Sequence, residues 1–299
     1  MYHALGDYRQ AIDVLRRNVA ALTGALRREH LGLPGLAAVL SRTWLARCLA
    51  EVGVFAEGRV LGDEATHMAE TADHPFSLCE AYSSLGRLSL RQGDVPTAIA
   101  LFARGLGVCQ DAHIHLLMPF VASDLGAAYL LGGRIAEALP LLEQAVAQTT
   151  TTGRVSHLAL FSVQLGLGYL RAGRLEDALS RAYHALTLTC THGERGYQAH
   201  ALRLLGEIAA HGEPPQVEPA TDYYQQSLAL ADELGMRPLL AHCHLGLGIL
   251  YNRIGRPEQA RAELAAAIEL YRAMEMIFWL ARAEAGLTAI EATTGEMDW

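Results

Sequence analysis

The feature of the sequence that most constrains the fold is an internal repeat of about 40 residues. The segments Tyr129–Val146 (YLLGGRIAEALPLLEQAV) and Tyr169–Leu186 (YLRAGRLEDALSRAYHAL) share the same order of small, aromatic and apolar residues, 40 positions apart. The turn glycines keep the same spacing, at Gly53, Gly93, Gly133 and Gly173. A fixed period of roughly 20–50 residues is typical of arrays whose units stack because none can bury its apolar face alone.

Small residues on either side of the turns show a second regularity. In five successive units a small residue after one turn lies 28 positions before the small residue of the next segment: Gly58 to Gly86, Ala98 to Gly126, Ala138 to Gly166, Ala178 to Gly206 and Ala220 to Gly248. Glycine or alanine where two helices cross lets their axes approach closely. The departures from the period fall in the loop-like stretches REHLGLPG and HGEPPQVEP, so the packed faces stay in register.

Each unit has the pattern of two antiparallel helices, because apolar residues recur at helical spacing on both sides of the turn glycine. We therefore expect an all-α fold, an α-solenoid wound as a right-handed superhelix of about six and a half hairpins. The expected units are a half repeat at 1–30, then repeats at 36–72, 76–112, 119–152, 156–192, 197–235 and 239–273, and a capping helix at 274–292. In the capping helix, the residues expected to face the core are Met274, Ile277, Phe278 and Leu280.

Three units carry the order LG-x-x-Y-x-x-x-G-x-x-x-x-A: LGAAYLLGGRIAEALPLLEQA, LGLGYLRAGRLEDALSRAYHA and LGILYNRIGRPEQARAELAAA. This pattern resembles the tetratricopeptide repeat, although the period is longer than the roughly 34 residues usual for it. The tail 260–287 is similar to the C-terminal repeat arrays of bacterial STAND-type ATPase signalling proteins, among them class III adenylate/guanylate cyclases and LuxR- or SARP-type transcriptional regulators. The resemblance implies the sensory arm of such a protein, and the chain indeed opens in mid-repeat.

Composition argues against several classes of function. The net charge is −8 and all 24 basic residues are arginine, which disfavours nucleic-acid binding and leaves no lysine for a Schiff base or a phosphate loop. The histidines of HIH (113–115) and HCH (242–244) are two positions apart, so on a helix they point about 200° away from each other and do not share a metal. We expect no catalytic residue, no metal and no cofactor, and thus no enzyme.

The cysteines and the apolar runs indicate the compartment. The five cysteines form no C-x-x-C motif and are expected to be small buried side chains in a reducing cytosol. No apolar run reaches the roughly 18 residues needed to cross a bilayer, and no secretory leader precedes the first amphipathic segment. We therefore expect a cytoplasmic protein that does not bind membranes.

The first helices of such hairpins form the concave wall of the solenoid, where a partner would bind. Counting from the small residue of each first helix, the residues expected in this groove are Arg47, Glu80, Arg87, Arg91, Phe120, Leu131, Leu160, Val163, Leu167, Arg171, His200, Arg203, Glu207, Asn252 and Arg253. An apolar middle with charged flanks suits an amphipathic helix or an extended segment. Packing between repeats, or a tight superhelix that closes the groove, would equally account for the apolar middle.

The sequence thus predicts a non-catalytic interaction and regulatory module of a bacterial signalling protein. Its expected partners are a protein or peptide segment, or its own ATPase, cyclase or DNA-binding domains. An exposed C-terminal helix would provide a surface for a homo-oligomer. A receptor for a small ligand or a signal peptide, like the quorum-sensing regulators, remains the alternative.

Overall fold

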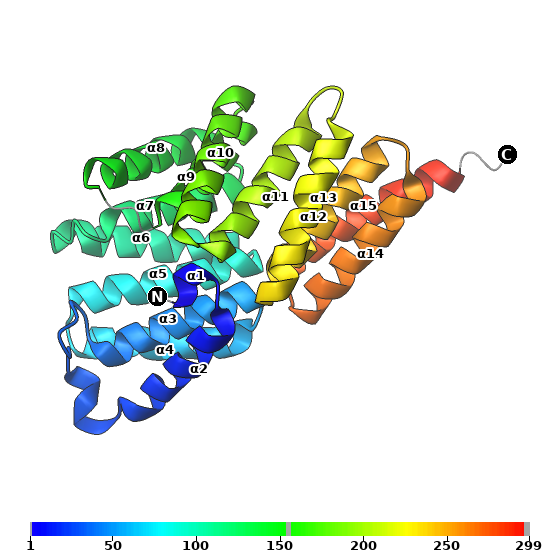
Figure 1. Cartoon of the computed structure of the whole chain (residues 1–299). Coiled ribbons are helices and arrows are strands. Elements are labelled where there is room, and N and C mark those ends of the chain that lie inside the picture. Colours follow the sequence, from blue (N-terminus) through cyan, green and yellow to red (C-terminus); the bar gives the residue numbers. More distant parts are fainter. Residues whose placement is uncertain (1, 154–156, 296–299) are drawn as a thin grey trace.

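A computed structural model describes residues 2–153 and 157–295, and within these ranges the chain is helical, without any strand (Figure 1). Met1, where the predicted half repeat begins, and residue 156, where the fourth predicted repeat begins, lie outside the described residues. The helices are α1 (Tyr2–Leu5), α2 (Tyr8–Ala21), the short 3-10 helix η1 (Gly24–Arg28), α3 (Ala37–Val52), α4 (Phe55–Thr71), α5 (Pro75–Gln92), α6 (Val95–Asp111), α7 (Met118–Leu131), α8 (Ile135–Thr151), α9 (Leu158–Arg171), α10 (Leu175–His192), α11 (Arg195–His211), α12 (Val217–Leu234), α13 (Arg237–Arg253), α14 (Pro257–Ala273) and α15 (Ile277–Gly295).

The helices pair into six hairpins, numbered 1 to 6 from α3–α4 to α13–α14, with α1–α2 before them and α15 after them. The sequence explains where each helix ends. Gly53 and Gly93 adopt the left-handed conformation that ends α3 and α5, with φ of 80° and 95°. Asp94 then accepts a hydrogen bond from the backbone N–H of Thr97 and so caps α6. The predicted all-α solenoid is confirmed.

The small residues lie where the two helices of a hairpin cross. A Cβ atom on Gly126 would stand 2.7 Å from Leu142 Cγ and 3.2 Å from the carbonyl oxygen of Ala138. In hairpin 4, a Cβ on Gly166 would stand 3.4 Å from the carbonyl oxygen of Ala178. Neither position has room for a larger side chain, so the spacing of small residues sets how the paired helices pack.

The array winds back on itself, so that late helices return to the first hairpins (Figure 1). Helix α11 contacts α1, and α13 contacts α3. The turn glycines of the first two hairpins lie under the far end of the chain: a Cβ on Gly53 would meet the Met274 sulfur, and a Cβ on Gly93 would stand 2.8 Å from Phe278 Cβ. Successive turns of the superhelix therefore touch, and the axis between them is filled by side chains.

Two expectations about burial need correction. Ile277 was expected in the core, but it begins α15 and is 66% exposed, whereas Met274 and Met276 beside it are buried. Cys190 was expected to be buried with the other cysteines, but it is exposed near the end of α10. Both residues lie on the solvent side of their helices. Among the described residues, no helix is both long and apolar enough to cross a membrane.

Candidate functional site

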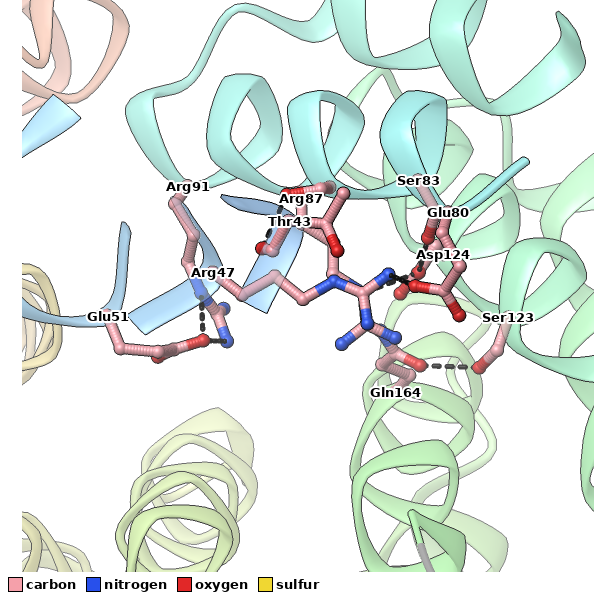
Figure 2. Close-up of polar contacts among 11 residues, drawn as sticks. Thr43, Arg47, Glu51, Glu80, Ser83, Arg87, Arg91, Ser123, Asp124 and Gln164 are labelled. Atoms are coloured by element: carbon pink, nitrogen blue, oxygen red, sulfur yellow. Dashed lines mark hydrogen bonds and ion pairs between the residues drawn. The ribbon is translucent and has the colours of Figure 1, made fainter. Parts of the chain in front are cut away.

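The first helices of hairpins 1 to 6 form one continuous layer, called here the inner layer: α3, α5, α7, α9, α11 and α13. In its first half, ion pairs join each helix to the next (Figure 2). Arg47 of α3 contacts Glu80 of α5 at 2.6 Å, and Arg87 of α5 contacts Asp124 of α7 at 2.7 Å. These side chains are largely or fully buried, so each charge depends on its partner for solvation.

A second polar cluster joins the two turns of the superhelix and is called here the inter-turn cluster. The Arg91 guanidinium donates two hydrogen bonds to Glu51 of α3 and lies 3.3 Å from Nε2 of His200, which reaches them from α11. Burial, and then Arg91, lower the pKa of His200 to about 4. Burial opposes ionisation of Glu51, but Arg91 and His200 outweigh it and hold the pKa of that carboxyl well below its usual range. At neutral pH the imidazole is therefore neutral, and its Nε2 lies within hydrogen-bonding distance of both Arg91 and Glu51 Oε2, which is 3.4 Å away.

Aromatic side chains fill the axis beside the ion pairs. The ring of His3 in α1 meets Trp44 edge-on at 5.3 Å between centroids, and it lies 6.4 Å from the ring of Tyr197 in α11. The Arg47 guanidinium stacks over Trp44 at 4.7 Å. Burial is the main cause that lowers the pKa of His3 to about 3. The N-terminal helix therefore closes the first part of the concave face.

The inner layer is accessible at the C-terminal ends of its helices from α7 onward. Arg171 of α9 is 47% exposed and contacts Glu207 of α11 at 2.5 Å. Arg253 of α13 donates to the carbonyl oxygens of Ala210 and Gly212. Ile249, one turn before Arg253, is 57% exposed, although the side chain is large and apolar. The residues Leu131, Leu167, Arg171, Glu207, Ile249, Asn252 and Arg253 are called here the open section.

The structure thus divides the predicted groove residues. Five are buried in this structure and offer no surface to a partner: Arg47, Glu80, Leu160, Val163 and His200. Seven are half-buried: Arg87, Arg91, Phe120, Leu131, Leu167, Arg203 and Glu207. Three are exposed: Arg171, Asn252 and Arg253. The continuous open groove expected from the sequence is limited to the C-terminal ends of α7, α9, α11 and α13, and buried residues occur in both halves of the layer.

Sequence reasoning missed several residues of this layer. Glu51 lies 40 positions before Arg91, at the equivalent position of the preceding repeat, so including that position in the first repeat would have found it. Asp124 and Trp44 also occupy equivalent positions of their repeats, two residues before the small residue of their helices. His3 had no such signal, because its burial depends on contact with a distant turn.

His242 and His244 of α13 take separate partners, as their helical spacing predicts. His113 and His115 were also expected on a helix, but they lie in the loop between α6 and α7, with their ring centroids 6.4 Å apart. His242 Nδ1 lies 2.7 Å from the Tyr271 hydroxyl, and His244 Nδ1 lies 2.7 Å from Glu263. No cluster of three metal-binding side chains occurs within the described ranges.

Comparison with known families agrees with this architecture. One tetratricopeptide repeat model matches residues 77–150, which span hairpins 2 and 3, and another matches residues 241–266 in hairpin 6. No curated protein sequence matches the chain significantly.

Solved structures extend the likeness to nearly the whole chain. The Rap conjugation gene regulator of plasmid pLS20, in complex with the Phr* peptide, aligns over 90% of this chain and 71% of its own, with 15% identity and a TM-score of 0.69. NprR in complex with its cognate peptide NprX aligns over 95% of this chain and 81% of its own, with 14% identity and a TM-score of 0.67. The Cut9–Hcn1 hetero-tetramer of the APC/C aligns over 94% of this chain but only 47% of that chain, with 17% identity and a TM-score of 0.62. At such identities the likeness concerns the fold: the chain is a helical solenoid, and its residues 77–150 and 241–266 match tetratricopeptide repeats.

Proposed function

We propose that the chain is a non-catalytic interaction module that binds a protein or peptide segment along the inner layer, at the open section. The observation that carries the proposal is the large apolar side chain of Ile249, which is 57% exposed on α13, one helical turn before the exposed Arg253. An apolar anchor in a layer that also exposes Arg171 and Arg253 suits a segment that combines apolar residues with carboxylates. Tetratricopeptide folds commonly serve as interaction scaffolds.

The buried contacts within the inner layer give the module a fixed frame. Ion pairs and aromatic contacts hold α3, α5 and α11 together, so a segment bound at the open section meets a preformed surface. Preorganisation lowers the entropic cost of binding. A segment that contacts both α9 and α13 would also bias the relative position of hairpins 4 and 6, and this is a route to regulation of a linked effector domain.

The test is a pull-down with the full chain, followed by measurement of affinity for the captured segment by fluorescence anisotropy. We expect Ile249→Glu and Arg171→Ala each to weaken binding about tenfold or more, because they remove the apolar anchor and a carboxylate partner. Leu179→Glu is the matched control, since Leu179 is an exposed leucine on the outer helix α10. Binding that survives both inner-layer changes and is lost with the control would refute the proposed surface.

The receptor for a free signal peptide is the second candidate, favoured by the likeness to the Rap regulator and NprR, which are described in complex with peptides. The two candidates differ in what is bound. A free peptide of a few residues should bind as tightly as the same sequence within a protein if the chain is a peptide receptor. The interaction-module proposal instead predicts that affinity falls when the segment is cut from its protein.

The wider setting is also part of the proposal. A bacterial, cytoplasmic signalling protein with an ATPase, cyclase or DNA-binding effector would agree with the resemblance of the tail. The exposed Ile277 at the start of α15 is the residue through which a homo-oligomer would form. Ile277→Arg should then lower the mass measured by light scattering, if the protein is an oligomer through this helix.

A further inference from the structure

Two cysteine side chains meet inside hairpin 2. Cys79 lies in α5 and Cys109 in α6, and their sulfur atoms are 2.6 Å apart. A disulfide bond is about 2.05 Å long, so the sulfurs lie little more than about half an ångström from bonding distance. Both side chains are fully buried, with 0% exposure. We propose that Cys79 and Cys109 are a disulfide-forming pair, which can link the two helices of hairpin 2 covalently.

The repeat shows that this position brings two helices close together. Cys79 and Cys109 are 30 positions apart, and hairpin 4 has Ala159 and Thr189 at the corresponding places, also 30 apart and fully buried. The corresponding pairs in the remaining hairpins are Val39 and Ala69, Pro119 and Thr149, Ala199 and Ala231, and Ala241 and Tyr271.

Hairpin 2 differs from the others in placing a thiol on both helices at this contact. The other three cysteines have no such partner: Cys48 and Cys243 are buried without a second thiol within hydrogen-bonding range in the described residues, and Cys190 is exposed. The expectation that all five cysteines serve only as small buried side chains therefore does not extend to this pair. A disulfide needs two sulfurs at one contact, and hairpin 2 provides them.

The chemistry requires an oxidant of the small-disulfide class, such as glutathione disulfide. One protein thiolate attacks a sulfur of glutathione disulfide, forms a mixed disulfide and releases one glutathione thiolate. The second protein thiolate then attacks the protein sulfur of the mixed disulfide and releases the other glutathione. The protein loses two thiol protons and two electrons, and one glutathione disulfide becomes two glutathione molecules.

Access limits the rate of this exchange. The hydrogen bond with Cys109 and burial raise the pKa of the Cys79 thiol, so little thiolate exists while the hairpin is closed. Opening of α5 from α6 exposes both sulfurs to the oxidant, and reclosing returns them to contact. A disulfide formed in this way would restrain α5, the helix that carries Glu80, Arg87 and Arg91 of the inner layer.

The test is incubation of the full chain with glutathione disulfide, with and without urea below the unfolding transition. We expect a mass loss of two hydrogens, maleimide labelling of three of the five cysteines after denaturation, and linkage of the tryptic peptides 60–87 and 105–134. The melting temperature should rise by roughly 5 °C and return on reduction.

Two variants make the result specific. The double variant Cys79→Ala, Cys109→Thr copies the residues of hairpin 4, preserves small side chains at the contact and should form no disulfide. Cys48→Ala is the matched control and should still form the link. Five labelled thiols under both conditions, or a link between any other two cysteines, would overturn the proposal.

Discussion

The neutral, buried imidazole of His200 makes stability depend on pH in a defined window. The pKa of His200 is about 4 in the folded chain, against about 6.5 for an imidazole in water, so the unfolded state binds the proton more tightly. A group whose folded pKa is lowered in this way contributes stability above the unfolded pKa and loses it as pH falls toward the folded one. From pH 7 to pH 5, His200 alone should lower the free energy of unfolding by about 2 kcal/mol.

Other titrating groups also lower the free energy of unfolding as the pH falls, but the effect of the carboxyl group can be separated from that of the histidines. His3, whose pKa is lowered to about 3, and His242, whose pKa lies well below the usual value, add their own losses over the same window. Glu51 also loses stabilising charge on acidification, but only below the ordinary carboxyl pKa of about 4.5. The interval from pH 7 to pH 5 therefore reports mainly on the buried histidines.

The measurement is urea unfolding at pH 7, 6, 5.5 and 5, with the free energy extrapolated to water at each pH. His200→Gln should reduce the loss between pH 7 and pH 5 by about 2 kcal/mol relative to the wild type, whatever its effect at pH 7. His67→Gln, at an exposed position on α4, should keep the wild-type loss because this side chain is in water in both states. If His200→Gln loses as much stability as the wild type, the assignment of a neutral His200 is wrong.

Three further changes test the packing. Ala178→Phe should lower the free energy of unfolding by about 1–3 kcal/mol, because Ala178 is fully buried against α9. Leu179→Phe, on the exposed side of the same helix, should change it little. Thermal unfolding of the two variants and the wild type measures the difference. Asp124→Ala should cost about 3–5 kcal/mol in urea unfolding, because it leaves the Arg87 charge largely buried without its partner. Gly93→Ala should destabilise the contact with α15 as well as strain the turn, and amide hydrogen exchange should show faster exchange in α15.

Matched changes decide these tests. Asp177→Ala breaks an exposed ion pair with Arg174 and should leave the free energy of unfolding almost unchanged, because water screens this pair. Gly133→Ala strains a turn glycine with φ of 76° that has no atom within 4 Å of the added methyl, so exchange in α15 should stay as in the wild type. Equal effects within either pair of variants would contradict the packing described above.

The repeat made most of the fold predictable. The spacing of small residues such as Gly126 and Ala138 depends only on how neighbouring helices cross, and this information lies within one hairpin. The turn glycines are similar, since a left-handed residue ends a helix wherever it occurs. The helix boundaries and the register of the hairpins follow from such local signals.

The candidate site was less predictable, because its state depends on contacts between turns. The sequence places Arg91 and His200 in the correct layer, but their meeting across 109 residues depends on the superhelical pitch. No local pattern records that pitch. The burial of His3 and the exposure of Ile277 could not be predicted for the same reason, because each depends on whether a distant helix covers the residue.

The contact between the start and the end of the array has a consequence for how this molecule unfolds. An open solenoid melts from its ends, because each unit depends only on its nearest neighbours. Here Met274 and Phe278 rest on the turns of the first two hairpins, and His200 shares a polar cluster with α3 and α5. Fraying at either terminus removes support from the other, so the chain should lose its structure in a single cooperative step.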